Sequence, residues 1–141
     1  MSLPDLIRDS LIDTREFEFG QVWTVNDELV SIPDADRIDE RILHNARIVL
    51  IVSNNSGNTD PLNPIVTVAP LSHRVDCIKF TDIELYAQRD NLKYDSIVRL
   101  RLAQPVLKAD LIKCLGLISM DGKGEVLIGL EEYFGLLVEE E

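Results

Sequence analysis

Two stretches of sequence decide the fold: Ala46-Arg-Ile-Val-Leu-Ile-Val-Ser-Asn-Asn55 and Pro64-Ile-Val-Thr-Val-Ala-Pro-Leu-Ser72. Both are rich in β-branched residues, and the polar segment between them is unsuited to a core, so we expect two consecutive buried strands. Arg47 stands at the head of the first strand and Ser72 at the tail of the second. Because antiparallel pairing brings the head of one strand beside the tail of the next, we expect function at this shared rim of the sheet.

Further strands are predicted on both sides of this pair. The alternation and composition of residues 20–25, 79–86, 95–102 and 112–118 favour strands, with a helical turn at 108–111. In the strand over 95–102, Arg99 and Arg101 are expected on one face. Short, apolar strands of this kind must curl to hide their edges. The chain is therefore predicted to be mainly β, forming a small, strongly bent antiparallel barrel.

Helices are expected around this barrel. Residues 2–13 have the spacing of a short amphipathic helix. Residues 36–43 have helical spacing within a long loop that we expect to fold partly on itself as a lid. A terminal helix capped by Ser119 or Asp121 is predicted to run to about Leu137. Its expected inner face consists of Val126, Leu127, Leu130, Tyr133 and Phe134.

The composition bounds the class of protein. A chain of 141 residues is suited to one domain. It contains neither an apolar run long enough for a membrane span nor a secretory pattern at its start, so we expect a cytoplasmic protein with no membrane partner. Cys77 and Cys114 are expected to be free, buried thiols.

The net charge of −11 is unevenly distributed. Residues 44–113 hold nine Lys or Arg and seven Asp or Glu, whereas the two flanks hold five basic and eighteen acidic residues. An acidic total disfavours nucleic-acid binding, but a slightly basic middle leaves it open. We hypothesise that an acidic flank, either the loop over 27–40 or the tail over 139–141, covers the basic face. The alternative is that the acidic flanks only keep the protein soluble.

In order and spacing, four motifs resemble those of the PemK/MazF-type growth inhibitors, the toxins of type II toxin–antitoxin pairs. They are Gly20-Gln-Val-Trp23, Arg47-Ile-Val-Leu-Ile-Val-Ser-Asn54, Ala69-Pro-Leu-Ser72 and Asp95-Ser-Ile-Val98. The resemblance implies an Src-homology-3-like barrel of the CcdB/PemK/MazF type over residues 20–137. It leaves an N-terminal helical extension over 1–19 and an acidic tail over 138–141.

The resemblance also implies an activity and partners. Members cleave single-stranded RNA without a metal or other cofactor, are usually homodimers, and are held in check by an antitoxin peptide. Three features depart from the family pattern: Ile48 replaces a proline, Arg101-Leu-Ala-Gln104 replaces Glu-Gln-Ile-Arg, and the chain is acidic.

The resemblance marks Arg47 and Ser72 as the candidate catalytic residues. The Arg47 guanidinium can donate hydrogen bonds to two phosphate oxygens of the RNA. The Ser72 hydroxyl can hydrogen-bond the 2′-hydroxyl or a phosphate oxygen. His73 is a further catalytic candidate because histidine changes charge near neutral pH, although it shares a face with Ser72 only if the strand ends there. The RNA-binding candidates are Arg99, Arg101, Gln104 and Asn54.

Each candidate also has a structural interpretation. Arg47 is equally consistent with a strand-end arginine paired to a surface carboxylate, and Ser72 with a turn hydroxyl. Gln104 is consistent with a solvated polar residue, and Trp23 with a core residue rather than a base-stacking platform. At the level of the whole chain, the alternative to an endoribonuclease is a catalytically inactive barrel that acts as a protein-binding or regulatory module.

Overall fold

The two apolar stretches form neighbouring antiparallel strands, β2 (Arg47–Ile51) and β3 (Ile65–Ser72), as their composition predicts. The structure is a computed structural model that describes residues 13–33 and 46–136. The helix expected over 36–43 and the tail over 138–141 lie outside the described residues. So does the helix expected over 2–13, except for its last residue, Asp13, which is not helical.

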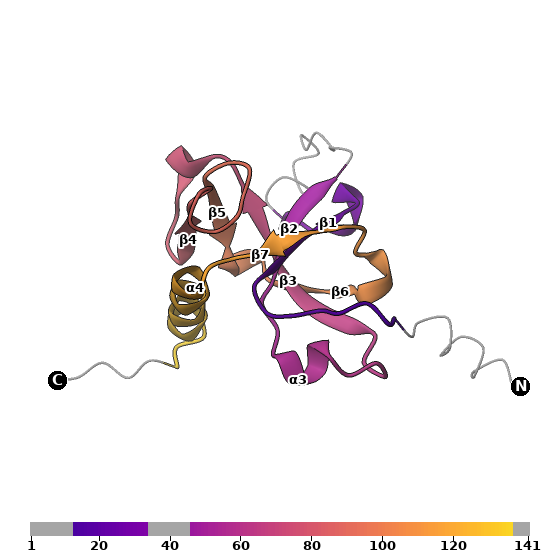
Figure 1. Cartoon of the computed structure of the whole chain (residues 1–141). Helices are drawn as coiled ribbons and strands as arrows, with labels where there is room; N and C mark the ends of the chain where they lie inside the picture. The colour runs from indigo at the N-terminus through magenta and orange to yellow at the C-terminus, as the bar shows by residue number, and fades with distance from the viewer. Residues whose placement is uncertain (1–12, 34–45, 137–141) are drawn as a thin grey trace, which may run out of the picture.

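The remaining strands complete one curled sheet. They are β1 (Gln21–Val25), β4 (Asp82–Leu85), β5 (Ser96–Arg99), β6 (Gln104–Leu107) and β7 (Cys114–Leu117). The sheet order is β4-β5-β3-β2-β1-β7, β6 also pairs with β3, and every pairing is antiparallel. Figure 1 shows the sheet wrapping round on itself, so the prediction of a mainly β, bent antiparallel architecture is confirmed.

Short helical segments connect the strands. Within the described ranges, the α-helices are α3 (Asn55–Asn58), which lies between β2 and β3, and the longer α4 (Met120–Tyr133), which follows β7. The 3-10 helices are η1 (Asp27–Leu29), η2 (Val75–Cys77), η3 (Leu100–Leu102) and η4 (Lys108–Asp110). The last of these is the helical turn expected at 108–111.

The bend of the sheet is located in β3, which changes partner along one edge. Residues 65–68 of β3 pair with β6, whereas Leu71 and Ser72 pair with β5. Pro70 lies where the partner changes, so the backbone hydrogen-bond donor that proline lacks is not needed there. The single strand predicted over 95–102 is therefore wrong, because η3 separates β5 from β6 and turns the chain onto the other half of β3.

Both faces of the central strands are buried, which explains why their sequences are continuous apolar runs. Alternate residues feed two cores: Trp23, Val49 and Val68 belong to one, and Val22 and Leu50 to the other. Trp23 stacks on Phe17 with ring centroids 5.1 Å apart and is 4 % exposed, so its interpretation as a core residue is confirmed.

Helix α4 covers the second core beside β4 (Figure 1). It begins after Ser119, whose hydroxyl accepts a hydrogen bond from the Gly122 backbone N–H, as the capping prediction requires. The predicted inner face is only partly correct: Val126 is buried and Leu130 half-buried. The three other members, Leu127, Tyr133 and Phe134, are 42–64 % exposed.

Two further expectations concern cysteines and membranes. Cys114 is a free thiol, but it is exposed on β7 rather than buried. Within the described ranges, none of the helices is long and apolar enough to cross a membrane.

Candidate active site

The pairing of β2 with β3 brings Arg47 and Ser72 to one rim of the sheet. The partners Val49–Pro70, Leu50–Ala69 and Ile51–Val68 fix the register, and continuing it places Arg47 opposite Ser72. Both side chains line a hollow of about 390 Å³, here named the Arg47 pocket. Its remaining lining comes from Ala46, Ile48, Leu71, His73 and Arg74. The antiparallel arrangement inferred from the two strands thus delivers a guanidinium and a hydroxyl to a common cavity.

Arg47 is anchored by a buried carboxylate. Its Nε donates to Asp27 Oδ1 over 2.8 Å, and the Asp27 side chain has no exposed surface. Asp27 begins η1 directly after β1, and the pairing of Val25 with Arg47 explains why the carboxylate is within reach. Among the described residues, the two Nη atoms of Arg47 have no hydrogen-bond partner. An arginine held through Nε keeps these terminal donors for an anion, so the ion pair is compatible with both interpretations of Arg47.

Ser72 makes a structural hydrogen bond that still leaves its hydroxyl able to donate to a ligand. Its Oγ accepts a hydrogen bond from the Arg74 backbone N–H over 3.2 Å, which is the turn contact considered for this hydroxyl. The side chain is half-buried at the wall of the Arg47 pocket. Because a hydroxyl both accepts and donates, this contact leaves the Ser72 proton for a ligand oxygen.

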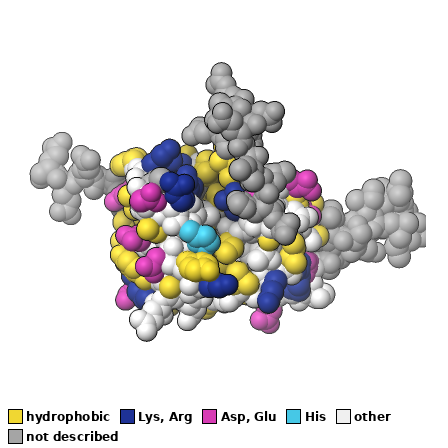
Figure 2. Space-filling model, turned by 90° about the horizontal axis from the view of Figure 1, so that it is seen from above, with side chains coloured by type: hydrophobic (Ala, Val, Ile, Leu, Met, Phe, Trp, Pro, Cys, Tyr) yellow, Lys and Arg dark blue, Asp and Glu magenta, His cyan; other side chains and the backbone are white. Residues whose placement is uncertain are grey.

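His73 meets the condition set for it by the sequence. Strand β3 ends at Ser72, so the His73 side chain is not forced onto the opposite face of the sheet from Ser72. Its ring is exposed and packs edge-on against Tyr94, with centroids 4.9 Å apart and planes at 72°. In Figure 2 the described histidine lies next to hydrophobic side chains on this face of the molecule, with both basic and acidic side chains nearby.

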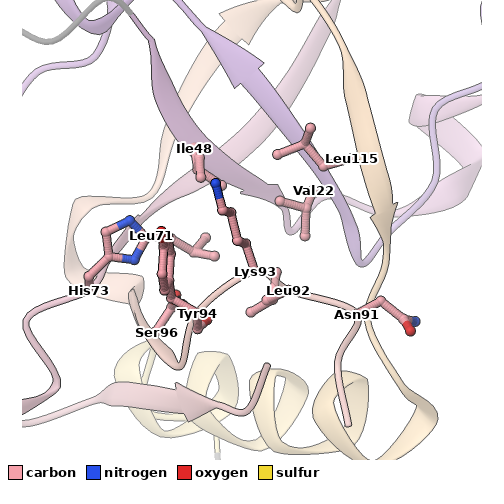
Figure 3. Close-up of a pocket in the computed structure, with 10 residues that line it drawn as sticks. All are labelled: Val22, Ile48, Leu71, His73, Asn91, Leu92, Lys93, Tyr94, Ser96 and Leu115. Atoms are coloured by element: carbon pink, nitrogen blue, oxygen red, sulfur yellow. Dashed lines mark hydrogen bonds between the residues drawn. The ribbon is translucent and has the colours of Figure 1, made fainter. Parts of the chain in front are cut away.

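A second hollow adjoins the first. It also measures about 390 Å³ and shares Ile48, Leu71 and His73 with the Arg47 pocket. Figure 3 shows Tyr94 beside His73 and Lys93 extended toward Ile48. We name this hollow, completed by Val22, Asn91, Leu92, Ser96 and Leu115, the Tyr94 pocket.

The RNA-binding candidates do not gather at these pockets. Arg101 lies in η3 and not on the strand that carries Arg99, so the prediction that both share a strand face is wrong. The Gln104 amide bonds to the backbone N–H and C=O of Ser31 and to the Leu102 carbonyl. Asn54 caps α3 at the other end of β2 from Arg47. None of the four lines either pocket.

Sequence reasoning missed three residues of this site. Asp27 was considered only as part of an acidic loop, although a carboxylate just after β1 is well placed to meet the head of β2. Lys93 and Tyr94 precede the Asp95-Ser-Ile-Val98 motif, and nothing in their spacing indicates a pocket.

Solved structures of MazF proteins share this fold. An endoribonuclease in complex with its cognate antitoxin from a mycobacterial species has a TM-score of 0.62 and 17 % identity, covering 89 % of this chain and 100 % of that one. The Mycobacterium tuberculosis toxin MazF-mt6 has a TM-score of 0.56 and 24 % identity, covering 67 % and 91 %. MazF from Deinococcus radiodurans has a TM-score of 0.63 and 15 % identity, covering 86 % and 98 %.

The sequence itself identifies the family. No curated protein sequence matches the chain. Residues 18–134, from just before β1 to the end of α4, match the family described as PemK-like, MazF-like toxins of type II toxin–antitoxin systems. That range contains the whole curled sheet and both pockets. The chain therefore belongs to the PemK-like, MazF-like toxin family of type II toxin–antitoxin systems.

Proposed function

We propose that the protein is an endoribonuclease toxin that cleaves single-stranded RNA at the Arg47 pocket. The observation that carries the proposal is that Arg47 on β2 and Ser72 on β3 line one open hollow. Family membership and the fold shared with an endoribonuclease support it.

The reaction requires no external nucleophile, because RNA carries its own 2′-hydroxyl. The 2′-oxygen attacks the adjacent phosphorus and loses its proton, the bond from phosphorus to the 5′-oxygen breaks, and the 5′-oxygen takes up a proton. The products are a 2′,3′-cyclic phosphate and a 5′-hydroxyl. In this scheme the nucleophile is the 2′-hydroxyl of the substrate, in place of a metal-bound water.

Arg47 and Ser72 have separate tasks in this scheme. The Nη donors of Arg47 hydrogen-bond the phosphate oxygens, where negative charge grows in the transition state. The Ser72 hydroxyl donates to a phosphate oxygen or holds the 2′-hydroxyl in line. His73, exposed on the same rim, is the side chain that we assign to proton transfer.

The local charge is suited to this substrate despite the acidic total. Among the described residues, Arg47, Arg74, Lys93 and His73 line the two pockets, and no carboxylate of that part of the chain does. A local cluster of cations attracts phosphate within about one Debye length, where a distant excess of acidic residues is largely screened.

We further propose that an antitoxin peptide regulates the protein and that the active form is a homodimer. One MazF-fold structure contains an endoribonuclease with its cognate antitoxin, and another is a MazE–MazF complex from Deinococcus radiodurans.

The decisive experiment is incubation of the protein with a long, unstructured RNA in EDTA. Cleavage that leaves 2′,3′-cyclic phosphate ends is expected. Arg47→Ala should lower the rate about 100- to 1000-fold, the usual loss when one transition-state donor is removed. Lys113→Gln is the matched control, because it removes an exposed cation outside both pockets and should leave the rate unchanged.

The Arg47–Asp27 ion pair favours one other function. A guanidinium whose charge is compensated by a buried carboxylate is consistent with an inactive barrel that binds protein. Absence of cleavage at micromolar protein, with Arg47→Ala indistinguishable from the unaltered protein, would select this alternative.

A further inference from the structure

We infer that the Tyr94 pocket binds a nucleobase of the RNA, the one beside the phosphate in the Arg47 pocket, by stacking it on Tyr94. This inference deepens the proposed function and rests on it for the position of the phosphate. Tyr94, His73 and Lys93 would then form a stacking subsite next to the cleaved bond.

The position of the pocket is the first support. The Tyr94 and Arg47 pockets share Ile48, Leu71 and His73, so they form adjoining parts of one groove. In a single strand of RNA each phosphate is flanked directly by the bases of its two nucleotides. A phosphate seated beside Arg47 therefore brings one neighbouring base to the Tyr94 pocket.

The lining of the pocket is the second support. Its aliphatic side chains come from five separate segments: Val22 on β1, Ile48 on β2, Leu71 on β3, Leu92 between β4 and β5, and Leu115 on β7. The Tyr94 side chain is 53 % exposed, and its ring is held by the edge contact with His73 and by Lys93 Nζ, 5.5 Å from its centroid. An apolar cavity with an exposed, fixed aromatic ring is suited to a flat aromatic ligand.

The polar groups define what kind of recognition is available. Ser96 Oγ donates to the Tyr94 carbonyl, and Asn91 Nδ2 donates to the Leu117 carbonyl, so both are already engaged. Figure 3 shows the Asn91 side chain directed away from the other labelled residues. Stacking without base-edge hydrogen bonds tolerates any base, so we expect weak base preference at this position.

The charge selects a nucleotide over an uncharged aromatic group. Lys93 lines the Tyr94 pocket with its Nζ over the Tyr94 ring, and within the described part of the chain it forms neither an ion pair nor a side-chain hydrogen bond. Arg47 and Arg74 line the adjoining pocket. A ligand with an aromatic ring and a nearby anion satisfies both parts of the groove, and a nucleotide has both.

The test uses short, fluorescein-labelled, single-stranded deoxyoligonucleotides and fluorescence anisotropy. These probes lack the 2′-hydroxyl, so binding is measured whether or not the protein cleaves RNA. In one series each base in turn is replaced by an abasic sugar. For the unaltered protein, one abasic position should weaken binding about tenfold, the order expected for one base stacked on one ring.

The variants separate stacking from a structural effect. Tyr94→Ala should bind the intact probe about tenfold more weakly and no longer respond to the sensitive abasic position, whereas Tyr94→Phe should behave like the unaltered protein. Tyr86→Ala is the matched control: Tyr86 is 42 % exposed with Arg89 over its ring, 4.8 Å from the centroid, and lies outside both pockets.

Two outcomes would overturn the inference. If Tyr94→Ala binds the intact probe as tightly as the unaltered protein, the pocket does not hold a base. A side chain of a protein partner would then be the alternative ligand of the pocket. If Tyr94→Ala weakens binding but still responds fully to the abasic position, Tyr94 only maintains the structure. If RNA cleavage depends on Arg47 and not on Tyr94, the stacking inference fails and the proposed function stands. If probe binding depends on Tyr94 but the protein cleaves no RNA, the proposed function fails and the stacking inference stands.

Discussion

Asp27 determines how Arg47 is presented to the Arg47 pocket. Its carboxylate is fully buried and accepts the Arg47 Nε hydrogen over 2.8 Å. A guanidinium fixed at Nε loses the freedom to rotate away from a ligand bound at its terminal nitrogens. In the proposed reaction we therefore expect the buried acid to act through Arg47, without touching the substrate itself.

The first prediction follows from this arrangement. Asp27→Ala should lower kcat about tenfold or more with little change in KM, because Arg47 remains but is no longer oriented. Asp27→Asn should recover part of the loss, since its amide oxygen still accepts from Nε. Glu28→Gln, an exposed neighbour, is the control. The measurement is single-turnover RNA cleavage, limited to variants that remain folded by circular dichroism, because breaking a buried ion pair costs about 3–5 kcal/mol.

The opposite result has a clear meaning. If Asp27→Asn cleaves faster than the unaltered protein, then the carboxylate competes with phosphate for Arg47. That result would support the hypothesis that an acidic segment covers the basic face, with Asp27 as its acting residue.

At this scale the sequence predicts the neighbours on a strand ladder better than contacts made by loops. Arg47 and Ser72 lie at one rim as predicted, because their positions follow from two apolar runs and antiparallel pairing. Gln104 could not be placed, because its partner Ser31 is 73 residues away and belongs to a different loop. Tyr94 was missed for the same reason, since its pocket is assembled from several segments.

Among the elements, α4 departs most from its predicted packing. Sequence periodicity selects the large apolar residues as the inner face, whereas the structure buries Gly122, Val126 and Gly129. A Cβ built at Gly122 would lie 2.5 Å from Asp90 Oδ1, and one at Gly129 would lie 2.7 Å from Leu100 Cδ1. A Cβ at either position would therefore force a neighbouring side chain to shift, and hydrophobicity alone contains no signal for this.

The second prediction compares two glycines of α4. Gly122→Ala should destabilise the protein by about 1–3 kcal/mol, because the added methyl group displaces a carboxylate held in a hydrogen-bond network. Gly124→Ala should instead stabilise it by up to about 1 kcal/mol, since a Cβ at Gly124 meets no atom within 4 Å and alanine favours the helix. Urea unfolding of both variants measures the difference. Equal effects of the two substitutions would contradict the close approach of α4 to Asp90.

For the whole molecule, the charge pattern reconciles an acidic chain with an anionic substrate. The net charge is −11, yet the pocket lining that the structure describes contains Arg47, Arg74 and Lys93 and no carboxylate. The sequence indicated this segregation, because the basic surplus of residues 44–113 is visible in the counts. The curl of the sheet concentrates part of that surplus at one rim, and this concentration depends on the fold.

Asp90 links the sheet to α4 and makes the stability of the whole fold depend on pH. Burial raises the pKa of this carboxyl, but hydrogen bonds from the Ser119 hydroxyl, the Tyr86 N–H and Arg89 outweigh burial, so the pKa is lowered below its ordinary value of 3.8. The ionised form is therefore favoured by folding. This contribution is fully present above the ordinary pKa and is lost as the pH falls through the lowered one.

The third prediction is that acid unfolding is sensitive to this one residue. The free energy of unfolding of the unaltered protein should fall as the pH drops below about 4, and Asp90→Asn should make that decline shallower while lowering stability at neutral pH. Asp121→Asn, which removes an exposed carboxylate from the first turn of α4, should keep the original slope. Urea unfolding at several pH values measures both slopes.

The same residue should also couple the unfolding of α4 to that of the sheet. Asp90 forms hydrogen bonds with both the loop after β4 and the cap of α4, so its protonation should unfold the helix and the sheet together. The transitions followed by circular dichroism and by Trp23 fluorescence should then coincide. If α4 instead melts at a higher pH than the sheet, Asp90 anchors the helix alone and the two parts are not one cooperative unit.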